Sequence, residues 1–194
     1  MILSVKYSFL FICNQRTAHK SMTSHLMQYV DSNDIVNQHR LYNHQSASVI
    51  KNIVKESLWN RLFRFTIVRN PYMRILRMWH KHPKVTKENI SFEQFVHGTY
   101  RWKQIPNQWE RISENDVALC RWWKFENGVD KAFREITTKI HEKNPTFPVL
   151  SLTAKREFEP DLDMLDYRDY YTAKMRQIVE QKHRDDLERF QYEW

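Results

Sequence analysis

Short apolar runs alternate with amphipathic segments along the first half of the chain. Residues 7–13 (YSFLFIC) and 63–68 (FRFTIV) are rich in aromatic and aliphatic side chains, which is typical of strands buried on both faces. A polar turn follows each run, and apolar residues at helical spacing then cover residues 21–30 and 72–80, with Pro71 in the first turn of the second helix. This order of strand, loop and helix predicts an α/β fold with a parallel sheet.

Further elements are predicted downstream. The apolar spacing indicates additional helices over residues 46–60, 92–96, 130–140 and 169–190. We expect Asp130 to cap its helix, irregular structure over residues 97–112, and an extended segment over residues 145–152. Residues 116–125 fit a strand and a helix equally well. Since no linker or composition break divides the chain, we expect one domain over residues 1–194.

Composition excludes several classes of protein. A chain of 194 residues with 41% hydrophobic and 14% aromatic residues is too apolar to be disordered. It contains no apolar run of about 18 residues that would span a bilayer. Its N-terminus lacks the basic segment and cleavage site of a signal peptide. Its two cysteines, Cys13 and Cys120, form no disulfide framework or metal-binding pattern, so we expect a cytoplasmic protein without a metal site.

The net charge of +8 is unevenly distributed. Residues 1–30 contain no acidic side chain, and residues 61–87 contain many arginines and lysines but no acid. Residues 157–194 are instead rich in Asp and Glu. The basic first half would attract an anion such as a phosphorylated cofactor or a nucleic acid, although a merely basic surface has the same composition.

A first candidate anion site lies between the first predicted strand and its helix. The loop supplies two cations, Arg16 and Lys20, and the hydroxyls of Thr17 and Ser21, next to a helix N-terminus. The chain has two glycines, at positions 98 and 128, so the loop is built without glycine. Two types of phosphate loop fit. An ATP-type loop would use Lys20-Ser21 but would lack its glycines, whereas Arg16–Ser21 follows a sulfotransferase-type pattern.

A second candidate site follows the strand over residues 63–68. Arg69 stands at the carboxyl end of this strand, where ligands bind in open α/β sheets. ATP-binding proteins of the P-loop type usually carry Asp there to hold Mg²⁺, whereas an arginine binds phosphate directly. Arg74 and Arg77 follow, and we expect at least one of them to face solvent or to form an ordinary salt bridge.

Several segments resemble one family. Residues 65–74 (FTIVRNPYMR) resemble the 3′-phosphate-binding motif of sulfotransferases that use PAPS (3′-phosphoadenylyl sulfate), in the branch that includes carbohydrate sulfotransferases. The family's other segments follow in the same order: "H-x-x-A" at residues 44–47, "F-x-x-F-V" at 92–96, "F-E-N" at 125–127, and "YY…D-x-x-x-F-x-Y" at 170–192. The resemblance therefore spans nearly the whole chain.

The resemblance implies a fold and a reaction. The fold would be a three-layer parallel β-sheet flanked by helices, of the P-loop nucleotide-binding-like sulfotransferase type. The enzyme would move a sulfuryl group from PAPS to a hydroxyl of a small molecule or glycan and release PAP, without a metal, a nucleic-acid partner or a membrane span. Because relatives with membrane anchors work in the Golgi and this chain shows no anchor, a bacterial or viral origin is favoured.

The resemblance also assigns roles to residues. The 5′-phosphosulfate would be held by Arg16, Thr17, Ala18, His19, Lys20, Ser21 and Met22. Ala18 and His19 stand where the family has glycines; their Cβ atoms restrict the backbone but remove no N–H, so the loop can still bind if these residues are right-handed. The 3′-phosphate would be held by Arg69, by Arg77 in place of the family's serine, and by the closing loop residues Lys155 and Arg156.

For catalysis, Arg16 and Lys20 would balance the charge of the transferring group. His44 is the expected base, with His19 and His39 as reserves, and Glu126 is expected to be structural. Three alternatives stay open: a small P-loop kinase that uses Lys20-Ser21, a catalytically weakened protein that binds PAPS or another anion, and a nucleic-acid-binding module. Trp102 and Trp109 are candidates for either the core or an acceptor cleft.

Overall fold

The computed structural model describes residues 1–30, 45–98, 101–152 and 166–194. They form two compact units, which we call unit 1 (Met1–Val68 and Glu110–Glu157) and unit 2 (Arg69–Trp109 and Phe158–Trp194). The chain leaves unit 1 after Val68 and returns at Glu110, so neither unit is one continuous segment. The single domain expected over residues 1–194 stays a prediction.

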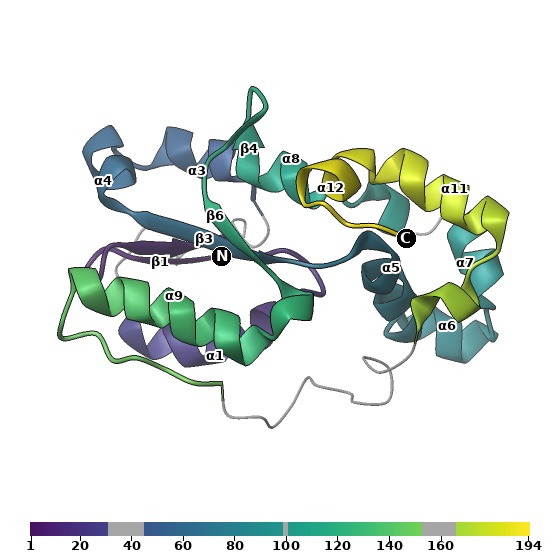
Figure 1. Ribbon diagram of the computed structural model, residues 1–194, viewed down its shortest axis with the longest axis horizontal. Coiled ribbons are helices and arrows are strands. Elements are labelled where there is room, and N and C mark those ends of the chain that lie inside the picture. Colours follow the sequence, from purple (N-terminus) through teal and green to yellow (C-terminus); the bar gives the residue numbers. More distant parts are fainter. Residues whose placement is uncertain (31–44, 99–100, 153–165) are drawn as a thin grey trace. The chain divides into compact units, whose positions relative to one another are not determined.

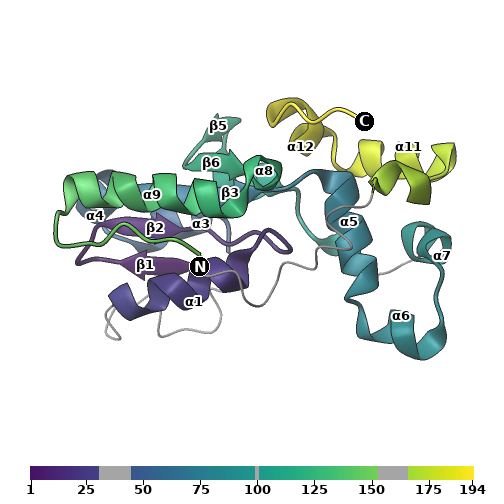
Figure 2. The same cartoon turned by 60° about the horizontal axis from the view of Figure 1, so that its bottom comes forward.

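Unit 1 contains a mixed sheet with the strand order β1-β2-β3-β6 (Figure 1). Its strands are β1 (Ile2–Ser4), β2 (Phe9–Phe11), β3 (Phe63–Val68) and β6 (Arg121–Lys124). β2, β3 and β6 run parallel, as predicted. β1 runs antiparallel to β2, with Ile2 opposite Phe11 (Figure 2). The α/β class is therefore confirmed, but the prediction of a wholly parallel sheet is wrong at this edge.

A tight turn explains the unpredicted first strand. The apolar run over residues 7–13 predicts a single strand, but Tyr7 and Ser8 belong to a turn in which Ser8 has a φ of 52° and its amide donates to the carbonyl of Val5. Ser4 stabilises the turn by accepting a hydrogen bond from the Tyr7 amide and donating one to the carbonyl of Tyr29. An antiparallel pair needs only such a short connection, whereas a parallel pair needs a crossover.

The sheet of unit 1 lies between two helical layers (Figure 1). On one face, α1 (His19–Leu26) and α9 (Val129–Lys143) bury an aromatic core to which the sheet contributes Phe9, Phe11, Phe63, Phe65 and Ile67. The other face carries α3 (Ala47–Ile53) and α4 (Glu56–Arg61), where the guanidinium of Arg64 lies 4.5 Å from the ring centre of Trp59. Alternation along the strands thus gives the three layers.

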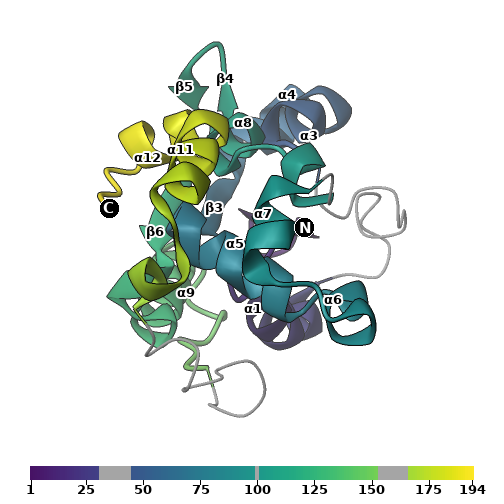
Figure 3. The same cartoon turned by 90° about the vertical axis from the view of Figure 1, so that its right-hand side faces the viewer.

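The described part of unit 2 is helical. Its elements are α5 (Pro71–His80), α6 (Pro83–Glu88), α7 (Phe92–His97), the short 3-10 helices η3 (Arg101–Gln104) and η5 (Tyr167–Tyr170), α11 (Ala173–Lys182) and α12 (Arg184–Arg189). α5, α7 and α11 pack together around an aromatic core that includes Tyr72, Phe95 and Trp102 (Figure 3). α8 (Gln108–Ile112) begins at the unit boundary.

Some helices are shorter than predicted. The segment predicted over residues 46–60 breaks into α3 and α4, because Val54 is extended. The one predicted over residues 169–190 breaks at His183 between α11 and α12. Residues 97–112, expected to be irregular, contain η3 and α8. Residues 116–125 form β5 (Val117–Ala118), which pairs with β4 (Ser113–Glu114), and then β6.

The N-terminus of α9 differs from the prediction in detail. Gly128, with a φ of 94°, occupies the N-cap position that we expected Asp130 to fill. Asp130 lies inside the first turn instead, and its carboxylate accepts a hydrogen bond from the Leu152 amide at 2.7 Å. The acid thus holds residue 152 of the segment that follows α9. Residues 145–147 of that segment form a turn and a bend, so our prediction of an extended segment is wrong there. Glycine provides the left-handed backbone at the helix entry.

Candidate functional site

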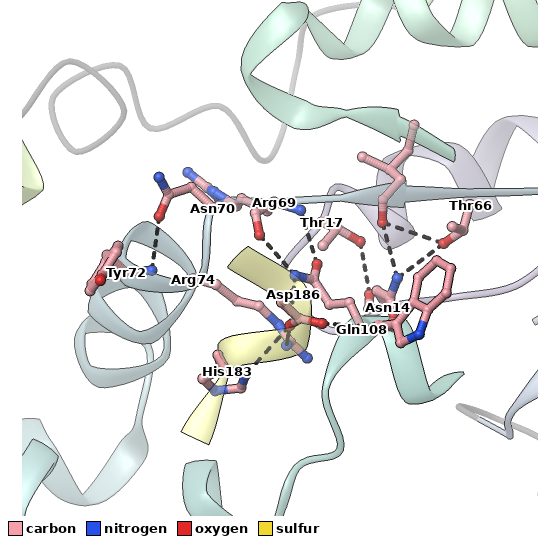
Figure 4. A network of polar contacts seen from close by, with 12 residues as sticks. Asn14, Thr17, Thr66, Arg69, Asn70, Tyr72, Arg74, Gln108, His183 and Asp186 are labelled. Carbon is pink, nitrogen blue, oxygen red and sulfur yellow. Dashed lines mark hydrogen bonds and ion pairs between the residues drawn. The ribbon is translucent and has the colours of Figure 1, made fainter. Parts of the chain in front are cut away.

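The loop between β2 and α1 is fastened to β3 at its first residues. The Ile12 amide donates to the carbonyl of Phe65 at 2.9 Å, which extends the strand pairing. The buried amide group of Asn14 donates to Thr66 Oγ1 at 3.1 Å and to the Ile67 carbonyl at 3.2 Å (Figure 4). The loop therefore begins from a fixed point at the carboxyl end of two parallel strands, where ligands bind in α/β proteins.

Two residues of this loop have a left-handed backbone. Arg16 has a φ of 63° and Ala18 a φ of 57°. Ala18 therefore does not have the right-handed backbone under which the sequence allowed the loop to bind, whereas His19 belongs to α1. A side chain in this region costs about 1–2 kcal/mol relative to the right-handed helix. Left-handed residues that alternate with other conformations turn successive amides toward one side, an arrangement that binds anions.

The N-terminus of α1 carries no side-chain cap. Ala18 is the N-cap residue and offers no acceptor, and the first turn contains no acidic side chain. The first intrahelical bond runs from the Met22 amide to the Ala18 carbonyl at 3.1 Å. The amides of the preceding turn therefore point out of the helix end, where an anion can accept from them.

The predicted loop residues contribute unequally. Arg16, His19 and Ser21 are half-buried, and Lys20 is exposed. Thr17 is buried, and its hydroxyl donates to the carbonyl of Asn14 at 3.0 Å, so this side chain closes the loop (Figure 4). The Met22 side chain lies in the apolar core of unit 1. Its amide is already bonded to the Ala18 carbonyl. Met22 therefore contributes packing to unit 1, and neither its side chain nor its amide is placed to bind a ligand.

In unit 2, Arg69 is the first residue after β3, and its peptide is held by one side chain. Gln108 Oε1 accepts from the Arg69 amide at 2.9 Å, and Gln108 Nε2 donates to the Arg69 carbonyl at 2.8 Å (Figure 4). Gln108 is fully buried. We predicted irregular structure at this position, and an isolated glutamine in the sequence gives no signal for such a clamp.

Asp186 is the centre of a buried polar cluster around that clamp. Its carboxylate accepts from Gln108 Nε2 at 3.2 Å and from the Trp109 amide at 2.8 Å. Arg74 Nη1 lies 3.8 Å from Asp186 Oδ2, and His183 Nδ1 lies 3.4 Å from the same oxygen. This buried ion pair agrees with the expectation that at least one of Arg74 and Arg77 faces solvent or forms a salt bridge. Asp186 belongs to the C-terminal "D-x-x-x-F-x-Y" segment, and the spacing alone did not reveal this partner set.

Burial and charge act on the pKa values of this cluster. Burial alone would raise the pKa of Asp186, but the adjacent His183 ring and the charge of Arg74 together lower it. Burial lowers the pKa of His183, and the nearby Arg74 charge acts in the same direction, against the pull of Asp186. Asp186 is therefore ionised and His183 is neutral near pH 7.

The segment that follows Arg69 is also fixed. The Asn70 side chain caps α5 by accepting from the Tyr72 amide at 2.9 Å. The hydroxyl of Tyr171, from the predicted "YY" segment, donates to the Tyr72 carbonyl at 2.9 Å, and burial raises the pKa of Tyr171 well above its usual value.

Three further predicted residues are buried. Arg77 lies in α5 and is 5% exposed. Trp102 and Trp109 are buried in the core rather than open to an acceptor.

Four predicted site residues, His44, the reserve base His39, Lys155 and Arg156, lie outside the described residues.

A cavity of about 540 Å³ in unit 1 is lined by Phe63, Arg64, Cys120, Arg121 and the last turns of α9. Those residues stand at the amino ends of β3 and β6, at the edge opposite to the Arg16–Met22 loop, so this cavity is not the predicted nucleotide site.

Comparison with family models, curated proteins and solved structures gives no match. Within the described residues, no helix is both long and apolar enough to cross a membrane.

Proposed function

We propose that this chain is a PAPS-dependent sulfotransferase that moves a sulfuryl group to a hydroxyl of a carbohydrate. The observation that carries the proposal is the uncapped start of α1, which follows a loop with left-handed Arg16 and Ala18 at the carboxyl end of β2. This arrangement favours an anion such as the 5′-phosphosulfate of PAPS. The family resemblance of the sequence supplies the identity of that anion.

The residues of the loop fit the chemistry of such a group. The guanidinium of Arg16 and the ammonium of Lys20 would balance the charge that develops on the sulfonate and on the leaving phosphate. The amides of the first turn of α1 would add hydrogen bonds. The residues that do not fit are Thr17 and Met22, whose side chains are committed to the loop and the core.

Arg69 would hold the 3′-phosphate. It belongs to unit 2 and the loop to unit 1, so this assignment rests on the resemblance and on the position of Arg69 directly after β3 in the chain. A guanidinium binds a phosphate in two parallel hydrogen bonds, which suits recognition of a terminal phosphate group.

The transfer itself is an in-line displacement. The acceptor oxygen forms a bond to sulfur while the bond between sulfur and the phosphate oxygen of PAPS breaks, and PAP leaves with that electron pair. The hydroxyl proton passes to a base, for which His44 is the proposed residue by its position in the "H-x-x-A" segment.

Thermal unfolding with PAP tests the proposal. A ligand at 100 times its Kd stabilises the folded state by about 2.7 kcal/mol, which corresponds to a rise of roughly 5–10 °C in Tm for a chain of this length. The same measurement with ATP and Mg²⁺ tests the kinase alternative. No rise at millimolar PAP with a folded protein contradicts the proposal, and a larger rise with ATP and Mg²⁺ favours a kinase. Transfer of labelled sulfate from PAPS to a panel of sugars then tests turnover.

A further inference from the structure

The peptide of Arg69 is held in a manner usually provided by a neighbouring strand. The amide and the carbonyl of one extended residue point to the same side, and in a sheet both pair with the next strand. After β3 ends at Val68, the side-chain amide of Gln108 takes that place, accepting at 2.9 Å and donating at 2.8 Å. The Arg69 backbone is thus fixed at both of its polar groups.

Asp186 determines which way the Gln108 amide faces. A glutamine amide has two N–H donors and one carbonyl acceptor. One donor goes to the Arg69 carbonyl and the other to Asp186 Oδ2 at 3.2 Å. A carboxylate accepts and does not donate, so the nitrogen must face Asp186, and the oxygen of Gln108 is then turned to the Arg69 amide. If the amide were reversed, Gln108 Oε1 would face Asp186 Oδ2, and two acceptor oxygens would meet without a proton between them.

Asp186 is itself held in place. Its other oxygen accepts from the Trp109 amide, the backbone group next to Gln108, at 2.8 Å. Arg74 and His183 are adjacent, and the carboxylate is completely buried. A buried charge of this kind costs free energy unless it is paired and hydrogen-bonded, and it contributes little net stability. What these contacts do provide is a fixed position for the carboxylate, and through it a fixed orientation of the Gln108 amide.

We propose that Gln108 and Asp186 are positioning residues that present the Arg69 side chain to the 3′-phosphate of the nucleotide. This inference rests on the proposed function, and it adds residues from α8 and α12 that act through the Arg69 backbone and need not touch the ligand. Loss of either residue frees the Arg69 peptide, so binding of the 3′-phosphate is weakened while binding of the rest of the nucleotide is kept.

The test compares two ligands that differ in one phosphate. The affinities of PAP and of adenosine 5′-phosphate, which lacks the 3′-phosphate, are measured by calorimetry at 25 °C, and their ratio reports the 3′-phosphate alone. Hydrogen bonds to a charged group are worth about 1.5–3 kcal/mol, so the wild-type ratio is expected to be about 10–150. Arg69→Ala should reduce this ratio to near one.

Gln108→Met removes the clamp and should reduce the ratio about tenfold. The Arg69 side chain would then lose the geometry of one charged hydrogen bond to the 3′-phosphate. Asp186→Asn is the milder variant, since it keeps the shape but allows the amide to reverse, and it should give a smaller fall in the same direction. Gln94→Met is the matched control. Gln94 also bonds to a backbone amide in unit 2, that of Ser91, and its substitution should leave the ratio unchanged.

A purely structural clamp gives a different result. Gln108→Met and Asp186→Asn would then lower Tm but keep the wild-type ratio in the folded protein, and this outcome overturns the inference alone. Absence of PAP binding by the wild-type protein overturns the proposed function and this inference together. A wild-type ratio well above one that falls in both variants, but not in Gln94→Met, supports both.

Discussion

The side-chain amide of Asn14 lies 3.1 Å from Thr66 Oγ1 and joins the start of the candidate phosphate loop to the neighbouring strand. Thr66 Oγ1 in turn donates to the carbonyl of Ile12, and both side chains are fully buried. These bonds connect the two parallel strands just before the loop leaves the sheet. The loop geometry therefore depends on a polar pair inside the core of unit 1.

Asn14→Ala should destabilise the protein by about 1–3 kcal/mol, because it removes two buried hydrogen bonds, to Thr66 and to the Ile67 carbonyl. Urea unfolding should show a lower midpoint at an unchanged slope. Ser24→Ala is the control, since Ser24 bonds to a carbonyl on the exposed side of α1. A loss of stability no larger than that of Ser24→Ala would show that the Asn14 bonds do not anchor the loop.

Ala18→Gly should stabilise the protein by about 1 kcal/mol. The left-handed backbone of Ala18 carries the cost of its Cβ, which glycine removes. The same change at Ala173, an exposed residue in the first turn of α11, should cost up to about 1 kcal/mol, as expected for a helix. If both changes destabilise equally, the backbone at residue 18 is not left-handed.

Gly128→Ala provides the reverse experiment. Gly128 has a φ of 94°, and the nearest atom to an added Cβ is Lys131 Cβ at 3.8 Å, so space is sufficient and only the backbone is strained. We expect a loss of about 1–3 kcal/mol in unfolding free energy, measured by urea titration. A neutral result would mean that the entry to α9 can relax.

The contrast between Ala18 and Gly128 also shows where prediction from sequence succeeds and fails. Strand β3 was predicted over its full length, because its aromatic and β-branched residues form a run that ends before Asn70-Pro71. The start of α5 was predicted from Pro71. The left-handed backbone of Ala18 was missed, because alanine favours the right-handed helix and only the fold imposes another conformation.

Long-range polar partners were missed for a related reason. Asp186 lies in the "D-x-x-x-F-x-Y" segment, but its bonds to Gln108 and Trp109 join residues 78 and 77 positions apart, and no local pattern encodes them. Hydrophobic periodicity reports the face that a helix buries. It does not report which polar group a buried carboxylate meets there.

Lys20→Ala should weaken PAP binding about tenfold with little change in the Tm of the ligand-free protein. Lys20 is exposed, so its removal leaves the core intact, while a charge-assisted hydrogen bond to the 5′-phosphate of PAP is lost. Calorimetry with PAP measures the effect. Lys174→Ala, an exposed lysine in the first turn of α11, is the matched control and should bind PAP as the wild type does.

The loss of PAP affinity in Lys20→Ala should also depend on the salt concentration. Pairing of an exposed cation with an anionic ligand is screened by ions, so the difference between wild type and Lys20→Ala should shrink as salt rises. A difference that is absent at low salt would remove Lys20 from the proposed site.

The stability of the protein should fall as pH drops below about 6.5, through His183. Burial lowers the pKa of His183 from its ordinary value of 6.5, so in this range the unfolded chain binds a proton that the folded protein does not. Protonation therefore favours unfolding, and stability increases with pH across this window. One titrating group adds at most about 1.4 kcal/mol per pH unit to this slope.

Urea unfolding at pH 7.5 and 5.5 measures this slope. His183→Gln should flatten it, by at most about 1.4 kcal/mol over the range, because glutamine does not titrate. Tyr171→Phe removes a buried hydrogen bond in the same unit without removing a histidine, and should lower stability equally at both pH values. The pKa of Asp186 is lowered from 3.8, so its own loss of stability comes near pH 4 and below, outside this range. An unchanged slope in His183→Gln would mean that His183 is not the group that takes up the proton on unfolding.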